Sequence, residues 1–534
     1  MATMSSQGTS QFGRWRRYLW PVHSYELKKL LPMLLIFFLV SFDYNVLRTM
    51  KDTVVIYAES SGAEVIPFIK VWVMFPGAVL MTYIFTLLSN RFSRESVFYI
   101  MVSSFLVFYF AYTFILYPFR DVLHPNQTAD YLATILPPGC KGLIAMFRNW
   151  TCTLFYVMAE LWSAIILSVL FWGFANQVTR LFEAKRFYGL FGIGANLSGV
   201  AAGAASVYIS QLEYNPSFPF GHNKWEQSSY LLTMLVVVAG ILSIFLFRWF
   251  NKTVLTDPRF YDPQEEHQAD KVRVKISLGQ AVSYLMRSRY LLCLAVIVIS
   301  YNLVINLVEV VWKSEVKDLY PDPNDYSIYM NRVVLVIGFI ATFTALFVSG
   351  NSLRKCGWTF TAMLTPVILL VTSAGFFTFL FLQEYISAGF VTMMGMSPLA
   401  IVVFFGSANN ILSRASKYSV FDATKEMAFV PLGSESKMKG KAVIDGVCSR
   451  FGKSGGSFIH QSLLLTFSTI SASAPYVAGF LIVIIVVWMA AIKLLGIKFN
   501  EITASVPHSI DITDKVKGQT FAIPKDLKEQ QAGI

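Results

Sequence analysis

The stretch APYVAGFLIVIIVVWMAAIKLL, residues 474–495, decides the class of fold, because Lys493 is its only charged residue. A run of about 20 mostly apolar residues is long enough to cross the hydrocarbon core of a bilayer as a helix. The rest of the chain has the same character: its 534 residues are 55% hydrophobic and 14% charged. Soluble proteins carry about 25% charged residues. The composition therefore predicts an all-α polytopic membrane protein that lies in a lipid bilayer.

Twelve apolar runs are long enough to be predicted membrane spans. They cover residues 30–48, 65–89, 96–118, 142–174, 186–210, 229–250, 289–312, 328–350, 358–382, 396–414, 442–468 and 474–495. The fourth run is longer than one crossing needs, which indicates a protruding or tilted helix. The polar segment 251–288 separates six spans from six. We therefore expect an N-terminal six-helix bundle over 30–250 and a C-terminal one over 289–495, with tails at 1–29 and 496–534.

The basic residues gather in the two tails, the linker and the even-numbered connections between spans. By the positive-inside rule, this distribution predicts that both termini and the linker are cytoplasmic. The first 29 residues are read as a retained tail and not as a signal peptide, because no small-residue cleavage site follows the first apolar run. The net charge of +12 then reflects basic loops and an affinity for anionic substrates, and no nucleic-acid partner is expected.

The residues that usually carry enzyme chemistry lack the required spacing. The five cysteines are scattered and the six histidines show no metal-ligand pattern, so we expect no metal and no cofactor. No nucleophile elbow is present, and the Gly-Lys-Ser string at 452–454 lacks the earlier glycine of a P-loop, since position 447 is Val447. The sequence therefore predicts a protein that is not an enzyme.

Three short strings recur six spans apart and in the same order, which indicates an internal repeat. The pairs are Gly173–Gln177 with Gly406–Asn410, Phe191–Gly194 with Phe451–Gly455, and Tyr44-Asn45 with Tyr301-Asn302. Parallel repeats are typical of transporters whose substrate site lies between two bundles. Channels do not usually need such a duplication.

Five of the charged residues within or at the edge of the apolar runs are the main candidates for a site: Lys70, Glu160, Glu309, Arg450 and Lys453. An ionisable side chain at the centre of a bilayer is costly, by about 3 kcal/mol on insertion scales, and therefore tends to line a substrate path. The cations are candidate ligands for phosphate oxygens. Snorkelling to the interface is the alternative for Lys70, and helix packing explains the glycines around Lys453 but not the charges.

The carboxylates Glu160 and Glu309 are candidates for coupling a proton or for gating, and Asp43 is a weaker candidate of the same kind. A protonated acid or a structural ion pair is the alternative for each. Lys51 ends the first predicted span together with Arg48 and Asp52. A solvated helix end is the default there, and the outer mouth of a cavity, with Lys51 near the substrate phosphates, is the functional alternative.

Several polar and aromatic residues could contact a nucleotide base. An asparagine amide matches the donor and acceptor pair of adenine, and an aromatic ring can stack on a base. Interhelical hydrogen bonds and packing are equally good explanations. The candidates for base contacts are Asn176, Asn302, Asn409, Tyr301 and Phe68.

The chain resembles the ATP/ADP translocase (nucleotide transporter) family of plastids and obligate intracellular bacteria. The strings that carry the resemblance, over roughly residues 25 to 500, are 63–70 (AEVIPFIK), 159–163 (AELWS), 171–177 (FWGFANQ), 305–313 (INLVEVVWK), 421–428 (FDATKEMA) and 439–445 (KGKAVID) leading into 452–456 (GKSGG). The family implies a twelve-helix fold like the major facilitator superfamily. Its functional intramembrane charges match Lys70, Glu160, Glu309 and Lys453.

The resemblance implies a nucleotide transporter of a bacterial inner membrane that exchanges ATP for ADP, with phosphate handled alongside in some members. The expected partners are ATP and ADP, and the expected oligomeric state is a monomer. The segment Ser300–Val304 departs from the pattern of energy-exchanging members. A proton-coupled nucleoside triphosphate symporter of broader base range is therefore the alternative, with Glu160 or Glu309 carrying the proton.

Overall fold

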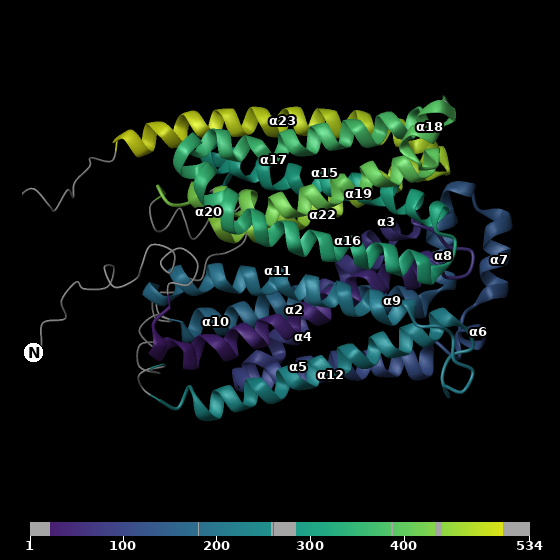
Figure 1. The fold of residues 1–534 in the computed structure, drawn as a ribbon, viewed down its shortest axis with the longest axis horizontal. Coiled ribbons are helices and arrows are strands. Elements are labelled where there is room, and N and C mark those ends of the chain that lie inside the picture. The colour runs from purple at the N-terminus through teal and green to yellow at the C-terminus, as the bar shows by residue number, and fades with distance from the viewer. Residues whose placement is uncertain are drawn as a thin grey trace, which may run out of the picture.

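The computed structural model describes residues 22–179, 181–257, 260, 283, 285–385, 388–432 and 440–505. This part of the chain is helical and contains no strand. The helices run roughly parallel in two layers, with the N-terminal half below and the C-terminal half above in Figure 1. Both halves therefore span the same thickness, and they meet along one long interface.

The N-terminal half runs from residue 22 to residue 257. Its α-helices are α2 (Leu27–Ile56), α3 (Val65–Ile69), α4 (Phe75–Arg91), α5 (Arg94–Ala111), α6 (Arg120–Leu123), α7 (Asn126–Ile135), α8 (Lys141–Arg148), α9 (Trp150–Trp162), α10 (Trp172–Val178), α11 (Leu181–Gln211) and α12 (Lys224–Thr253). The π-helical segments Lys70–Met74, Tyr112–Leu116 and Ser163–Phe171 continue three of the spans.

The C-terminal half begins at residue 285. Its α-helices are α15 (Arg289–Leu319), α16 (Pro323–Thr344), α17 (Gly350–Phe381), α18 (Ala388–Met394), α19 (Pro398–Ser416), α20 (Asp422–Ala428), α22 (Ser449–Phe467) and α23 (Ile470–Ser505). π-Helical segments occur at Ala345–Ser349, Lys417–Phe421 and Ala442–Cys448. Such segments widen a helix by one residue per turn and are frequent at functional sites.

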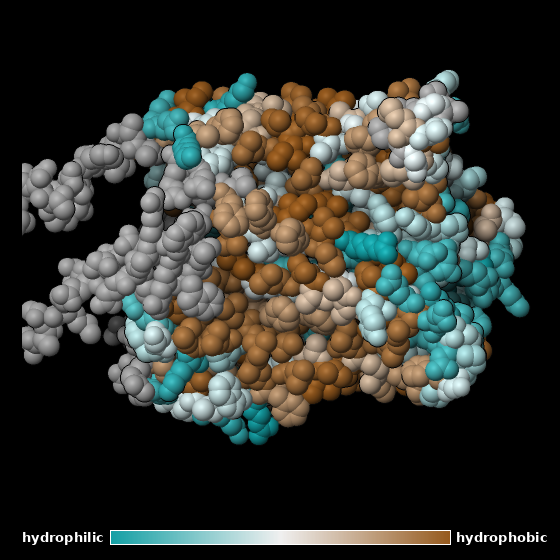
Figure 2. Space-filling view, in the orientation of Figure 1, coloured by the Kyte–Doolittle hydropathy of each residue, from teal (hydrophilic) through white to brown (hydrophobic). Residues whose placement is uncertain are grey.

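Eleven helical stretches within the described ranges are long and apolar enough to cross a membrane. Figure 2 shows the matching surface, which is hydrophobic across the middle of the molecule and hydrophilic at its two ends. We call the end that carries α6, α7, α8 and α18 the loop side, and the opposite end, where α2 begins and α23 finishes, the termini side (Figure 1). The prediction of a polytopic helical membrane protein is confirmed.

The twelfth predicted span, 442–468, is helical and packs against α15 and α23 in the C-terminal bundle. It falls short of the hydropathy that the other eleven reach, since α22 carries Arg450, Lys453 and three glycines. The described residues thus form twelve long helical segments, six in each half.

Two boundaries differ from the prediction in an informative way. The run 142–174 is two helices, because α8 ends at Arg148 and α9 begins at Trp150, and α8 lies on the loop side. The first span continues to Ile56, so Lys51 and Asp52 lie inside α2 and are buried. The default prediction of a solvated helix end is therefore wrong for these two residues.

One of the three proposed repeats has a structural counterpart. Asn45 and Asn302 each donate from Nδ2 to the carbonyl four residues earlier, over 2.8 Å. Each also faces a glycine of the fifth helix of its own half, Gly199 on α11 and Gly452 on α22. The first span of each half therefore packs on the fifth in the same way.

The members of the other two pairs of strings do not occupy equivalent positions in the two halves. Gly173–Gln177 follows the π-helical segment of its span, whereas Gly406–Asn410 lies within α19, ahead of the corresponding segment. The glycine that faces Asn45 is Gly199 and not Gly192. Small residues recur often in membrane helices, so short matches of this kind arise by chance.

The halves meet most extensively where α11 packs on α16. Glycines allow this close approach: a Cβ at Gly203 would lie 2.8 Å from the carbonyl oxygen of Asn331, and one at Gly338 would lie 2.6 Å from that of Asn196. The second contact between the halves joins α22 to α3 and to the Lys70–Met74 segment. Small residues at a helix crossing are the usual means of such packing in membranes.

Candidate functional site

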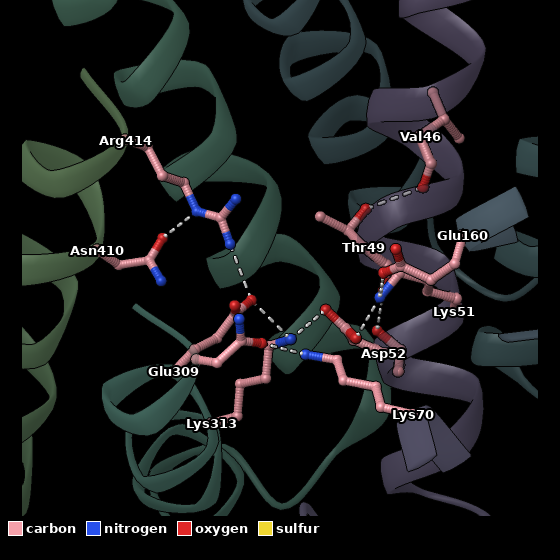
Figure 3. Close-up of polar contacts among 12 residues, drawn as sticks. Val46, Thr49, Lys51, Asp52, Lys70, Glu160, Glu309, Lys313, Asn410 and Arg414 are labelled. Atoms are coloured by element: carbon pink, nitrogen blue, oxygen red, sulfur yellow. Dashed lines mark hydrogen bonds and ion pairs between the residues drawn. The ribbon is translucent and has the colours of Figure 1, made fainter. Parts of the chain in front are cut away.

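A continuous string of ion pairs joins four helices at the interface between the halves (Figure 3). Lys51 Nζ lies 3.1 Å from Glu160 Oε1 and 2.8 Å from Asp52 Oδ1. Lys313 Nζ lies 2.7 Å from Asp52 Oδ2 and 2.9 Å from Glu309 Oε1. The string therefore runs from α9 through α2 to α15, with cations and anions in alternation.

Arg414 extends the string onto α19. Its Nη2 lies 2.9 Å from Glu309 Oε1, and its Nε donates to Asn410 Oδ1 over 3.0 Å (Figure 3). Glu309 consequently accepts from two cations at once. An anion that attracts Arg414 would compete directly with Glu309 for it.

Burial varies along the string. The side chains of Lys51, Asp52 and Lys313 are each 3% exposed. Glu160 is 29% exposed, whereas Glu309 and Arg414 are 14% and 13% exposed. The centre of the string is therefore dry, and solvent or a solute reaches it only from its ends. Lys51 also packs over the ring of Tyr156, 4.0 Å from its centroid.

Lys70 opens the π-helical segment of the second span and points toward the string (Figure 3). Its Nζ donates to Asn306 Oδ1 of α15 over 2.7 Å, so that it binds a neutral amide of the other half and no carboxylate among the described residues. Snorkelling to the interface is therefore the wrong explanation for Lys70. A cation held by an amide alone remains available to an anionic ligand.

Three further cations near the string have no ion-pair partner in the described part of the chain. Lys453 on α22 is exposed and lies within electrostatic reach of Glu160, Lys417 and Arg414. Lys417 lies 5.7 Å from the ring centroid of Tyr301 and Arg48 is half-buried on α2. Unpaired cations at membrane depth are expensive unless a ligand neutralises them. The site therefore carries an excess of positive charge.

Two tyrosines share this environment. Tyr44 on α2 is half-buried and lies within electrostatic reach of Glu160, Arg48 and Arg414. Tyr418, next to Lys417, is 41% exposed and belongs to the electrostatic surroundings of both Tyr44 and Lys453. Their rings offer partly exposed aromatic surface beside the unpaired cations.

Two predicted site residues take no part in the ion pairs of this cluster. Arg450 is exposed on α22 and makes no ion pair in the described part of the chain. Asp43 is fully buried in α2, and neither of its carboxylate oxygens has a hydrogen-bond partner among the described residues.

The residues proposed for base contacts are mostly occupied elsewhere. Asn409 donates to Thr372 and Ser373 within the C-terminal bundle. Asn176 is exposed and accepts from Tyr188.

The other candidates are buried. Asn302 donates a hydrogen bond to the carbonyl oxygen of Val298 within α15, and its side chain packs against Gly452. Tyr301 stacks on Phe421 with ring centroids 4.7 Å apart, and Phe68 packs against Gly142. None of the five proposed base contacts offers the partly exposed surface beside the cations that Tyr44 and Tyr418 offer.

Sequence reasoning gave no role to Lys313, Arg414, Lys417 and Tyr418, and read Asp52 as a helix end. A signal existed for Lys313, because it stands four residues after Glu309, and opposite charges at this spacing pair on a helix. Arg414 stood at the boundary of the predicted span 396–414, where a basic residue is typical of a membrane interface. The helix continues beyond it, through the π-helical segment to Ala428.

Solved transporters share the fold. The chain aligns with a D-xylose–proton symporter at a TM-score of 0.52 and 12% identity, covering 88% of this chain and 97% of the symporter. It aligns with a bacterial homologue of the iron transporter ferroportin, in its inward-facing state, at a TM-score of 0.51 and 14% identity, covering 90% and 100%. At such identities the likeness concerns the fold alone, which this chain shares with both transporters.

Sequence relatives are much more similar. ADP,ATP carrier protein 1 of Chlamydia muridarum is 46% identical over 532 residues, which are 99% of this chain and 100% of the carrier. The chloroplastic ADP,ATP carrier protein 1 of Arabidopsis thaliana is 41% identical over 476 residues, 89% of this chain and 74% of the carrier. Residues 5–499 match the sequence model described as TLC ATP/ADP transporter. The chain therefore belongs to the TLC ATP/ADP transporter family.

Proposed function

We propose that this protein exchanges ATP for ADP across a bacterial inner membrane by alternating access, without chemistry on the nucleotide. The observation that carries the proposal is the group of unpaired cations Arg48, Lys70, Lys417 and Lys453 between the halves, beside the partly exposed rings of Tyr44 and Tyr418. A polyphosphate would neutralise the cations, and a tyrosine ring would stack on the base. The names of the Chlamydia and plastid relatives support the choice of ATP and ADP.

Within this proposal, Lys70 and Lys453 bind the phosphates, and Arg414 joins them when substrate draws it from Glu309. While the site is empty, Glu309 pairs with Arg414 and Glu160 pairs with Lys51. Lys51 is too deeply buried to meet the substrate and acts through its ion pairs with Asp52 and Glu160. The predicted phosphate role of Arg450 has only its spacing from Lys453 in its favour.

Exchange, as opposed to one-way transport, follows from the cost of the empty site. A buried charge whose partner is removed costs about 3–5 kcal/mol, so an empty site with unpaired cations reorients rarely. A bound nucleotide neutralises the cations and lowers that barrier in both directions. ATP and ADP must both satisfy the same cations, although they differ by one phosphate.

We also propose that both termini and the linker 251–288 are cytoplasmic, as the positions of the basic residues indicate. The termini side is then the cytoplasmic face. One chain supplies both halves of the site, which suits a monomer. The same assignment treats 30–250 and 289–495 as the two bundles that rock against each other.

Reconstituted full-length protein tests the proposal by back-exchange. Labelled ATP should enter proteoliposomes loaded with ADP, saturate with concentration, and continue unchanged when a proton uncoupler is added. If ATP entered empty vesicles and the uncoupler abolished this uptake, the exchange mechanism would be wrong and proton symport would be correct. Competition by a panel of nucleotides and inorganic phosphate would define the base preference.

A further inference from the structure

The polar contacts that join the two halves gather toward the loop side. Lys317 Nζ donates to the carbonyl oxygen of Ser61 over 2.6 Å, and Tyr57 donates to the carbonyl oxygen of Tyr320. Thr49 Oγ1 donates to an asparagine of α16 over 2.8 Å. The structure is therefore a state in which the loop side is closed.

Among the ion pairs between described residues, one crosses from half to half: Asp52 of α2 with Lys313 of α15. The carboxylate divides its two oxygens between the halves, since Oδ1 faces Lys51 and Oδ2 faces Lys313. Both side chains are almost fully buried. Separating a buried ion pair is costly when either charge is left buried without a partner.

We propose that the Asp52–Lys313 pair is the latch of the loop side, and that the substrate releases it through Glu309 and Arg414. This inference rests on the proposed function for the identity of the substrate. The position of the latch rests on geometry alone. Neither Asp52 nor Lys313 touches substrate in this scheme, so both are positioning residues.

The release follows from competition for Lys313. In the present state Glu309 divides its attraction between Arg414 and Lys313, whose nitrogens lie 2.9 Å from the same oxygen, Oε1. A polyphosphate that takes Arg414 leaves Glu309 with Lys313 alone. Glu309 then attracts Lys313 more strongly, along α15 and away from Asp52. Occupancy of the site thus weakens the ion pair that, among the described residues, crosses between the halves.

The order of burial supports this direction of signalling. Arg414 and Glu309 are partly exposed, whereas Lys313 and Asp52 are dry. A ligand can therefore act on the outer members of the string but cannot reach the latch itself. Lys51 keeps Asp52 neutralised after Lys313 departs, which spares the open state an isolated buried charge.

Distances across the loop side test the latch. Spin labels are placed at Val122→Cys and Tyr385→Cys, two highly exposed loop-side positions in opposite halves, after replacement of the five native cysteines. Double electron–electron resonance on full-length protein in lipid nanodiscs then measures the separation without nucleotide. In protein with the intact Asp52–Lys313 pair, the two labels should show mainly one short distance. Asp52→Asn should raise the ratio of long to short distances at least about fivefold, the lower end of typical coupling between two states.

Lys313→Met is the second variant and should act in the same direction, which keeps the test decisive if one of the two proteins does not fold. Lys141→Gln is the matched control, because it breaks an ion pair with Glu64 on the same side but within one half. Its distances should equal those of the parent protein. Nucleotide uptake into empty vesicles should rise in Asp52→Asn and not in Lys141→Gln.

Unchanged distances in folded Asp52→Asn and Lys313→Met would overturn the latch, whatever the substrate is. The nucleotide arm is separate: adding ATP or ADP to the parent protein should increase the long distance. If the latch variants open the loop side while neither nucleotide does so, the latch stands and the assignment of the substrate fails. If inorganic phosphate alone opens it, the releasing ligand is the phosphate group and not the base.

Discussion

Lys70 Nζ and Asn306 Oδ1 lie 2.7 Å apart and join the second span of one half to the first span of the other. The lysine is thereby aimed at the interface with its charge uncompensated. We expect Lys70→Gln to raise the KM for both nucleotides about tenfold or more, since a hydrogen bond to a charged group contributes about 1.5–3 kcal/mol. Initial rates of exchange in proteoliposomes measure this. Asn306→Ala should change KM far less, and an equal loss in both variants would mean that the bond between the halves matters more than the phosphate.

Lys453 and Arg450 form a matched pair of basic residues on α22. Both are exposed, and Lys453 lies within electrostatic reach of Glu160 and Arg414. Lys453→Ala should reduce exchange about 10-fold to 100-fold, the equivalent of one or two charge-assisted contacts. Arg450→Ala should transport close to the wild-type rate. The amount of folded protein, measured by size-exclusion chromatography, should be similar for both. If Arg450→Ala reduced exchange more than Lys453→Ala does, Arg450 and not Lys453 would be the phosphate ligand.

Tyr418 and Tyr301 separate stacking on the base from packing. A base stacked on an aromatic ring contributes about 1–3 kcal/mol, so Tyr418→Leu should raise the KM for ATP by about fivefold to 100-fold. Inhibition of exchange by inorganic triphosphate, which has no base, should be unaffected. Tyr301→Leu removes a buried ring that packs on Phe421 and Trp488, and should lower thermal stability. If Tyr418→Leu weakened inhibition by inorganic triphosphate as much as it raised the KM for ATP, the ring would not stack on the base.

The spans and several site charges could be predicted because both depend on the local contrast between apolar and charged residues in the sequence. An apolar run of 20 residues has few explanations, and a charge within it, such as Glu160, stands out by its energetic cost. The positions of Lys70 and Lys453 followed for the same reason. These inferences need no knowledge of which helices are neighbours.

Asp52 and Lys313 show where such reasoning ends. Each lies beyond the apolar part of its helix, where a charge is ordinarily solvated, and nothing local distinguishes a buried pair from two wet residues. Their burial depends on the contact between α2 and α15, which brings together two residues that are 261 positions apart in the sequence. Tyr301 shows the converse error, because its aromatic ring suggested a base contact and the fold packs it against Phe421 and Trp488.

Gly139 brings the connection between the third and fourth spans against the backbone of α22. A Cβ at this position would lie 2.6 Å from the carbonyl oxygen of Leu464 and 2.8 Å from the Cα of Leu465, and neither backbone atom can move aside. Overpacking of this kind costs about 1–3 kcal/mol. Gly139→Ala should therefore weaken loop-side closure, lower the exchange rate and lengthen the distance between labels at Val122→Cys and Tyr385→Cys.

Gly189 on α11 is the matched control, because a Cβ there meets nothing within 4 Å. Gly189→Ala should transport normally and be slightly more stable, since alanine is favoured over glycine within a helix by about 1 kcal/mol. Normal exchange and unchanged distances in Gly139→Ala would mean that this contact has no part in closing the loop side.

Asp43 and Glu160 test which carboxylate the transport cycle uses. Glu160 pairs with Lys51, whereas both oxygens of Asp43 are buried without a hydrogen-bond partner among the described residues. An ionised carboxylate in such surroundings costs several kcal/mol, so we expect Asp43 to be a neutral acid in this state. Asp43→Asn keeps its size and neutrality and should exchange nucleotides near the wild-type rate. Glu160→Gln leaves Lys51 with Asp52 as its one carboxylate partner among the described residues and should reduce exchange several-fold, measured as initial rates in proteoliposomes.

The pH dependence of exchange distinguishes the two roles for Asp43. If Asp43 were a coupling carboxylate, it would have to lose its proton during the cycle, and Asp43→Asn would strongly reduce transport while remaining folded. Its remaining activity would also no longer respond to a proton gradient. A neutral structural acid predicts neither effect, because asparagine satisfies the same buried position at every pH. Exchange by wild type and Asp43→Asn, measured from pH 5 to pH 8 with and without an uncoupler, should therefore give superimposable profiles.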